Sequence, residues 1–297
     1  MEKITAIGEI LFDIYPESAN LGGAPLNFLY HVHKLTGKGN IISRVGNDEP
    51  GEKALNFLNN RGVNTGYIQI DHIHPTGVTT VTLDEQKVPS FKIDVDRAYD
   101  FIEGTSEIEN LVRKETDCLY FGSLAQRHEV TRNTIQSFLN KEIKYFCDLN
   151  LRQNFYSEEI IINSIKSANV LKINIDELKL VNKIIFKKGY SFETATSDLL
   201  KNFNIELLAI TKGADGSTLF CENEVDDFKN FPGEVVDTLG AGDAFASMLC
   251  IGFLRGWKPG KINQLANEFA GEICKIKGAL PQSDELYAGI KEKMNYA

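Results

Sequence analysis

The run from Asp237 to Asp243, Asp-Thr-Leu-Gly-Ala-Gly-Asp, has the composition of a phosphate-binding loop that carries a carboxylate. Gly240, Ala241 and Gly242 have almost no side chain, so an anionic oxygen can approach their backbone N–H groups closely, as phosphate sites at helix starts require. A carboxylate at Asp243 would repel a bound phosphate, yet it is a suitable base for a hydroxyl that attacks that phosphate. The pattern predicts phosphoryl transfer, with the three small residues as the binding loop and Asp243 as the base.

The residues after the glycines predict where this loop lies. Residues 244–254 are apolar on nearly every side, which is typical of a buried helix, so the start of this helix would carry the loop out of the core. The positive end of the helix dipole would add to the attraction for phosphate. The alternative is a glycine-rich turn in which Asp243 only complements the helix dipole, an effect worth about 0.3–1 kcal/mol.

Two other nucleotide-binding loops are excluded by spacing. The sequence has no G-x-x-x-x-G-K-[ST] run, and the third glycine position of a dinucleotide fingerprint that starts at Gly240 is occupied by Phe245. Neither a P-loop nor a dinucleotide-dependent oxidoreductase is therefore predicted. A sugar- or nucleotide-binding regulator without activity stays open, although the intact loop and Asp243 weigh against it.

Short apolar runs alternate with helical patterns along the chain. A strand at residues 4–8 is followed by a loop that contains Gly22 and Gly23 and by a helix through Phe28 and Leu35. Further strands are predicted at 40–45, 118–121, 145–148, 170–173 and 207–211. Strands spaced by helices predict an α/β fold with a mostly parallel central sheet flanked by helices, whose ligands bind at the carboxyl ends of the strands.

One segment departs from this alternation. Residues 77–83 and 88–93 alternate polar and apolar side chains around residues 84–87, which predicts a hairpin. The hairpin could cover the strand ends as a small β lid that excludes water, or it could be a plain edge hairpin. Because the sequence has no internal repeat and no linker, we expect a single α/β domain over residues 1–297, with a lid formed mainly by the hairpin at about 78–96.

Composition limits the partners and the compartment. The net charge of -9 and the isoelectric point near 5.2 make nucleic acid and anionic membranes poor partners. Glu9 and Asp13 interrupt the first apolar stretch and no later run is long enough to span a membrane, so we expect a cytoplasmic protein. The cysteines at 118, 147, 221, 250 and 274 are expected to be buried thiols, and the histidine pairs 31/33 and 72/74 to be surface or loop residues rather than metal ligands.

These motifs resemble those of the PfkB, or ribokinase-like, family of carbohydrate kinases. The family's C-terminal signature, Asp-Thr-x-Gly-Ala-Gly-Asp, is matched at every fixed position by residues 237–243, and its N-terminal Gly-Gly-x-x-x-Asn is matched by residues 22–27. Residues 8–13 are similar to the family's opening strand, whose Asp holds sugar hydroxyls. Residues 148–152, 174–177 and 211–216 are similar to further elements in the expected order. The resemblance covers nearly the whole chain and implies a ribokinase-like α/β fold.

By this resemblance the protein is an ATP-dependent sugar kinase that uses Mg²⁺. The sugar would contact Asp13, Gly22, Gly23 and Asn27, with Arg97 and Arg152 as further candidates. ATP would lie across Asn174, Thr211, Gly213, Gly216 and Asn267. Glu177 would hold Mg²⁺ directly or through water, and a monovalent cation such as K⁺ and a homodimer through the lid are further candidates. Asn174 with Glu177 is equally a helix capping box, and Gly213 and Gly216 are equally the glycines of a hairpin turn.

The motifs are most similar to those of the bacterial fructokinase branch, so the expected reaction is D-fructose to fructose 6-phosphate. A sugar acid, 2-keto-3-deoxygluconate, would need a cation for its carboxylate, and Arg97, Arg127 and Arg152 are available. A riboside also stays open, because Leu26, Phe28 and Leu29 around Asn27 are larger than the residues usual in that branch.

Overall fold

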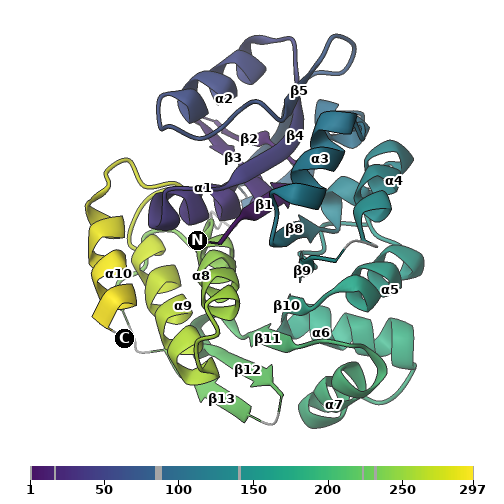
Figure 1. Cartoon of the computed structure of the whole chain (residues 1–297), viewed down its shortest axis with the longest axis vertical. Helices are drawn as coiled ribbons and strands as arrows, with labels where there is room; N and C mark the ends of the chain where they lie inside the picture. Colours follow the sequence, from purple (N-terminus) through teal and green to yellow (C-terminus); the bar gives the residue numbers. More distant parts are fainter. Residues whose placement is uncertain are drawn as a thin grey trace.

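Nine strands form the larger of two sheets (Figure 1). The structure is a computed structural model that describes residues 2–16, 18–83, 89–139, 142–222, 224–230 and 233–296. Seven neighbouring strands of this sheet are parallel, and two antiparallel strands extend one edge. In spatial order the sheet contains β13 (Glu224–Phe228), β12 (Ser217–Cys221), β11 (Leu207–Thr211), β10 (Val170–Asn174), β9 (Lys144–Asp148), β8 (Cys118–Gly122), β1 (Ile4–Ile7), β4 (Asn40–Gly46) and β5 (Ile68–Asp71).

Both faces of this sheet are buried. Because side chains alternate along a strand, Ala6 of β1 and Tyr120 of β8 belong to one hydrophobic cluster, whereas Ile7 and Phe121 belong to another. Both clusters contain fully buried side chains. This double burial explains why the central strands are continuous apolar runs rather than alternating patterns.

Two groups of helices cover the two faces, as Figure 1 shows. Helices α1 (Ala24–Thr36), α2 (Glu49–Asn59), α8 (Ala241–Leu254), α9 (Pro259–Ile273) and α10 (Glu285–Tyr296) contribute to the cluster around Ala6. Helices α3 (Ser106–Lys114), α4 (Glu129–Phe138), α5 (Glu158–Ser167), α6 (Ile175–Val181) and α7 (Phe192–Asn202) contribute to the cluster around Ile7. The predicted α/β architecture is confirmed.

A smaller, four-stranded sheet contains the predicted hairpin. Its order is β3 (Ser18–Gly22), β2 (Leu11–Tyr15), β6 (Gly77–Leu83) and β7 (Pro89–Ile93). Strands β6 and β7 pair antiparallel, and the turn between them, residues 84–88, lies outside the described residues. The loop expected between the first strand and the first helix is wrong, because β2 and β3 occupy that segment and form half of the small sheet.

The other predicted strands are confirmed, whereas one expectation about histidine is wrong. His31 is a fully buried residue of α1, and its Nδ1 atom lies 2.9 Å from the hydroxyl of Tyr287 in α10. Burial lowers the pKa of His31 to about 3, so this ring is neutral and serves the packing of α1 against α10. Cys118, Cys147 and Cys250 are buried as expected, but Cys221 and Cys274 are only partly buried. Within the described residues, no helix is both long and apolar enough to cross a membrane.

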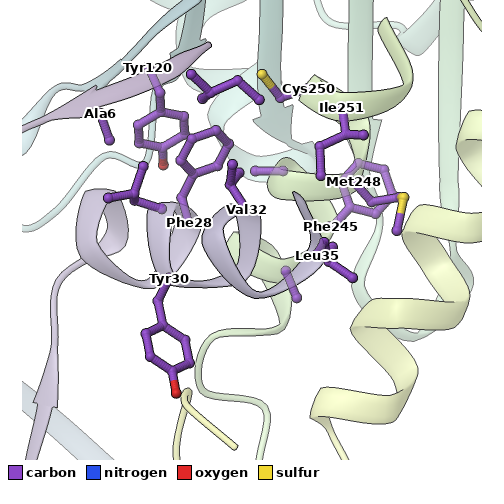
Figure 2. Close-up of a cluster of buried hydrophobic side chains, with 14 of the residues drawn as sticks. Ala6, Phe28, Tyr30, Val32, Leu35, Tyr120, Phe245, Met248, Cys250 and Ile251 are labelled. Atoms are coloured by element: carbon purple, nitrogen blue, oxygen red, sulfur yellow. The ribbon is translucent and has the colours of Figure 1, made fainter. Parts of the chain in front are cut away.

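Phe28 joins helix α1 to the sheet, and its removal is a test of this packing (Figure 2). Its ring is fully buried and stacks on Tyr120 with the ring centroids 3.9 Å apart. We expect Phe28→Ala to lower the free energy of unfolding by about 3–5 kcal/mol, because a large cavity would remain in the core. The measurement is guanidinium-induced unfolding. Val235→Ala, at a side chain that is 62% exposed, should change the same quantity by less than about 0.5 kcal/mol, and equally small effects would contradict the packing.

Candidate active site

Helix α8 positions the predicted glycine loop. Its residues from Ala244 to Gly252 are buried, which fixes the helix in the core, whereas Gly242 in its first turn is exposed. Gly240, the residue that begins the helix, has a φ of 79°, and a Cβ atom there would lie 2.4 Å from the Cβ of Ala279. Glycine is therefore required at 240 for the chain to follow this path.

Asp237, the first residue of the motif, holds this loop in place. Its Oδ1 atom accepts a hydrogen bond from the amide of Leu239 at 3.0 Å, and its Oδ2 atom accepts one from the amide of Gly278 at 2.9 Å. Asp237 thus connects the loop to the segment that follows α9.

Asp243 lies at the start of α8 and contacts helix α1. Its Oδ2 atom accepts a hydrogen bond of 2.8 Å from the Nδ2 atom of Asn27. Loss of solvation raises the pKa of Asp243 to about 7; the Asn27 hydrogen bond opposes the rise and the charge of Asp148 adds to it. A carboxylate with such a pKa can accept a proton near neutral pH.

The two glycines before α1 allow the chain to pass close to two acidic side chains. A Cβ atom on Gly22 would lie 3.2 Å from the Oδ2 atom of Asp13, and one on Gly23 would lie 2.4 Å from the backbone oxygen of Glu9. Asp13 lies on β2, in the small sheet rather than on the first strand, and it is 8% exposed. Burial raises the pKa of Asp13 to about 6, against the opposing effect of Arg152.

Glu9 is a member of this site that the sequence analysis missed. It follows β1 and is 3% exposed, and the amide of Ala24 at the start of α1 donates to its carboxylate. Burial raises the pKa of Glu9 to about 7, and the nearby charge of Asp243 adds to the rise. Its Oε2 atom has no hydrogen-bond partner among the described residues.

A buried ion pair beside the glycine loop was also missed. Lys172 of β10 and Asp148 of β9 are direct neighbours in the parallel register, and the Nζ atom lies 3.0 and 2.9 Å from the two carboxylate oxygens. Asp148 also accepts a hydrogen bond of 3.2 Å from the hydroxyl of Tyr120. The sequence alone does not indicate this pair, because the contact depends on the register between β9 and β10.

The residues that are expected to bind the nucleotide begin at the carboxyl ends of strands β10 and β11. Asn174 and Thr211 are register partners at the ends of β10 and β11, so their side chains lie on adjacent strands. Asn174 and Glu177 form the capping box of α6: Asn174 Oδ1 accepts from the amides of residues 176 and 177, and Glu177 Oε2 accepts from the amide of Asn174 at 2.9 Å. The other oxygen of Glu177 accepts from the amide of Leu151 at 2.7 Å.

Three further residues that are expected to bind the nucleotide also have a role in the fold. Gly213 and Gly216 have φ angles of 61° and 91° in the turn between β11 and β12. A Cβ atom on Gly216 would lie 2.0 Å from the backbone oxygen of Phe228, so the turn requires glycine there. Asn267 is buried on α9, where its Nδ2 atom donates to Ser217 Oγ at 2.7 Å. Asn267 therefore also joins α9 to β12.

The three candidate arginines have different surroundings. Arg152 is exposed and interacts electrostatically with the carboxylates of Glu9, Asp13 and Asp243. Arg97 instead forms an ion pair with Asp94, and Arg127 forms a two-pronged pair with Asp100 at 2.7 Å. The charge of Arg152 thus acts on three carboxylates of the site, whereas Arg127 acts on Glu9 alone among them and is paired with Asp100.

Known proteins are similar to this chain in sequence and in fold. The family described as "pfkB family carbohydrate kinase" matches residues 1–285. An uncharacterized sugar kinase from Pyrococcus horikoshii, PH1459, is 32% identical over 309 aligned positions, which cover 95% of this chain and 94% of the relative. The crystal structure of PH1459 in complex with ATP has a TM-score of 0.80 at 26% identity and covers 97% of this chain and 99% of that one.

Fructokinases are also similar to this chain. The fructokinase of Vibrio alginolyticus is 26% identical over 311 aligned positions, which cover 96% of this chain and 98% of the relative. A structure of fructokinase from Vibrio cholerae, with fructose, ADP and a potassium ion bound, has the same fold, with a TM-score of 0.78 at 23% identity over 97% of this chain and 98% of that one.

The burial of Glu9 predicts a pH-dependent stability. A carboxyl group whose pKa rises from 4.5 to about 7 on folding holds its proton more tightly in the folded chain, so its stabilising contribution is complete below about pH 4.5 and is lost as pH rises through 7. We therefore compare the free energy of unfolding of Glu9→Gln with that of the unmodified protein by urea unfolding. We expect this difference to be more favourable to the variant by about 2 kcal/mol at pH 8 than at pH 5.

The control is Glu292→Gln, at an exposed position of α10. It should change the free energy of unfolding equally at the two pH values. If Glu9→Gln also behaves in this way, the carboxyl of Glu9 does not hold its proton more tightly in the folded protein.

Proposed function

Because the chain belongs to the pfkB family of carbohydrate kinases, we propose that it transfers the γ-phosphoryl group of ATP to a primary hydroxyl of a small sugar, with Asp243 as the base. The position of Asp243 is the observation that carries this proposal. Its carboxylate directly follows the glycine loop, is held by Asn27 and has a raised pKa. A base and a phosphate-binding loop are therefore within one helical turn of each other.

The reaction exchanges one phosphorus–oxygen bond for another. The sugar oxygen forms a bond to the γ-phosphorus, the bond from that phosphorus to the bridging oxygen of ADP breaks, and the hydroxyl proton passes to a carboxylate oxygen of Asp243. The amides at Gly240, Ala241 and Gly242 and the start of α8 would stabilise the negative charge on the transferred group. Asn27 holds the carboxylate in the orientation in which it accepts the proton.

The balance of acidic groups and cations in the site supports binding of ATP as its Mg²⁺ complex. The carboxyl groups of Glu9, Asp13, Asp148, Glu177 and Asp243 interact here with the three cations Lys172, Arg152 and Arg127, so acidic groups outnumber cations in the site. Mg²⁺ prefers oxygen ligands and usually keeps several waters, which fits carboxylates such as Glu177 whose oxygens are already held by amides. Mg²⁺ would neutralise charge on the phosphate oxygens. Within the described ranges, no three His, Cys, Asp or Glu side chains are grouped to hold a metal ion by themselves.

Unpaired acceptors support a polyol beside Asp243. The Oδ1 atom of Asn27 and the Oε2 atom of Glu9 are buried without a partner in the described part of the chain, and hydroxyl groups of a sugar are suitable donors for both. Asp13, Gly22 and Gly23 border the same region. We propose that these residues bind the sugar, that the small sheet closes over it as a lid, and that ATP lies across Asn174, Thr211, Gly213, Gly216 and Asn267.

We propose D-fructose as the substrate, with fructose 6-phosphate as the product. The similarity to fructokinases over most of the chain supports it. The exposed charge of Arg152 favours a second candidate, a sugar acid such as 2-keto-3-deoxygluconate, because the guanidinium group can bind a carboxylate in a bidentate manner. A riboside is a third candidate, and a binding protein without turnover is the alternative to any kinase.

Asp243→Asn tests the base. We expect kcat to fall by roughly 10²- to 10⁴-fold with little change in ATP affinity, because a positioned proton acceptor is removed and the loop amides remain. In the unmodified protein, activity should rise with pH through about 7, since only the ionised form of Asp243 can accept the proton. Asp284→Asn, which removes a carboxylate of a surface ion pair, is the matched control and should leave kcat unchanged. Near-normal turnover of Asp243→Asn would refute the assignment.

ADP release from Mg-ATP in the presence of different acceptors tests the substrate. The panel contains fructose, glucose, ribose, tagatose, 2-keto-3-deoxygluconate and nucleosides, and we expect fructose to give the highest kcat/KM. If the sugar acid leads instead, Arg152→Gln should lower kcat/KM by roughly 10- to 100-fold through loss of a charged hydrogen bond. No turnover together with thermal stabilisation by ATP would favour the non-catalytic alternative.

A further inference from the structure

Lys172 is a buried cation that the proposed reaction does not yet use. Its residue is 8% exposed, and its ammonium group donates to both oxygens of Asp148. An ammonium group has three N–H donors, so this pairing leaves one of them for another acceptor. Burial alone would lower the pKa of Lys172, but the charges of Asp148 and Glu177 raise it above its usual value, so the group stays protonated.

The carboxylate partner is itself fixed. Asp148 is 1% exposed at the end of β9, and it accepts a hydrogen bond from Tyr120, whose ring stacks on Phe28. The direct register of Asp148 and Lys172 brings both side chains to the same face of the sheet. Two strands and one aromatic stack thus determine where the ammonium group lies.

This position is beside the glycine loop. The Nζ atom of Lys172 lies 3.6 Å from the place that a Cβ atom on Gly242 would occupy, and its charge also acts on Asp243. Because residue 242 is glycine, it places no side chain between the ammonium group and the exposed start of α8. An anion bound at the loop amides would be within short electrostatic range of Lys172.

An ion pair at this depth is not explained by stability. Desolvation of two buried charges commonly cancels their attraction, and the strands β9 and β10 are already joined by their backbone pairing. A cation here does, however, offset the carboxylates that surround the site of an incoming triphosphate. Its location suits the stabilisation of charge on a phosphoryl group.

We propose that Lys172 is the cation that stabilises the transferred phosphoryl group from beside the glycine loop, and that Asp148 is the positioning residue that holds it there. The proposal rests on the proposed kinase function. The proposal predicts that Lys172 raises the affinity of the protein for nucleotides with a γ-phosphate relative to nucleotides without one.

The experiment separates this role from simple neutralisation of Asp148. Lys172→Met alone would leave Asp148 buried without its partner and could unfold the chain, so the informative variants are Asp148→Asn and the double variant Asp148→Asn with Lys172→Met. Asparagine keeps an acceptor for Tyr120, and methionine keeps the approximate length of lysine. The two variants differ only in the ammonium group.

Affinities for ADP and for the non-hydrolysable ATP analogue AMP-PNP would be measured by calorimetry with Mg²⁺, beside kcat. Asp148→Asn removes the charge that holds Lys172 but keeps an amide oxygen that can accept from it, so we expect this variant to bind AMP-PNP about 3-fold more weakly than the unmodified protein. The double variant should bind AMP-PNP about 10-fold more weakly than Asp148→Asn, with the affinity for ADP nearly unchanged, and should have a kcat about 100-fold lower. Lys144→Met with Glu206→Gln removes an ion pair near the amino end of β9 and should change neither quantity.

Other outcomes would overturn this inference, the kinase proposal or both. If the double variant matches Asp148→Asn in AMP-PNP affinity and kcat, or if it loses ADP and AMP-PNP equally, Lys172 is only a counter-ion and the inference is wrong. If the unmodified protein turns over no sugar but its preference for AMP-PNP depends on Lys172, Lys172 binds the γ-phosphate as proposed and the kinase proposal fails. Failure of the unmodified protein to bind either nucleotide would overturn both.

Discussion

The packing of helix α1 against helix α8 is the contact on which the candidate site depends. Both helices lie on the same face of the large sheet, and their side chains form one core with Phe28, Val32, Phe245 and Met248 (Figure 2). Each helix begins beside the carboxyl ends of the parallel strands, α1 after Gly23 and α8 after Gly240. The hydrogen bond from Asn27 to Asp243 is therefore a consequence of core packing: any shift of one helix along the other would break it.

The electrostatics of the site follow from the same geometry. Parallel strands bring their polar ends to one edge, so carboxylates that are distant in sequence become neighbours in a poorly solvated region. Desolvation, with a smaller contribution from neighbouring carboxylates, raises the pKa values of Glu9 and Asp243 to about 7 and that of Asp13 to about 6. Acidic groups that hold their protons near neutral pH are therefore gathered at this edge of the sheet.

The small sheet contributes Asp13 to the candidate site. Strand β2 carries Asp13, and the chain returns through β3 to the two glycines before α1, so the small sheet and the start of α1 are parts of one continuous segment. Strand β6 joins β2 in parallel, and the Asp13 carboxylate accepts a hydrogen bond from Thr79 of β6. A movement of the small sheet would therefore move Asp13 together with β6.

Local patterns in the sequence were enough for the α/β class, the central strands, the buried helix α8 and the loop from Asp237 to Asp243, because burial on both faces and glycine-rich composition are visible within a few residues. The edge strand β13 was missed because Glu224–Phe228 is half-exposed and carries too few apolar residues to be recognised. Strands β2, β3, β5 and β12 were not predicted either. The sequence could not predict which buried polar residues lie together, because these contacts depend on strand order and register. The residues concerned are Glu9, Tyr120, Asp148 and Lys172. Asn27 and Asp243 are 216 positions apart, and their contact was fixed only when two helices packed on one sheet. The sequence by itself determined which residues could bind phosphate and accept a proton, whereas the tertiary structure decided which charges surround them, because strand register and helix packing set the distances on which electrostatics depends.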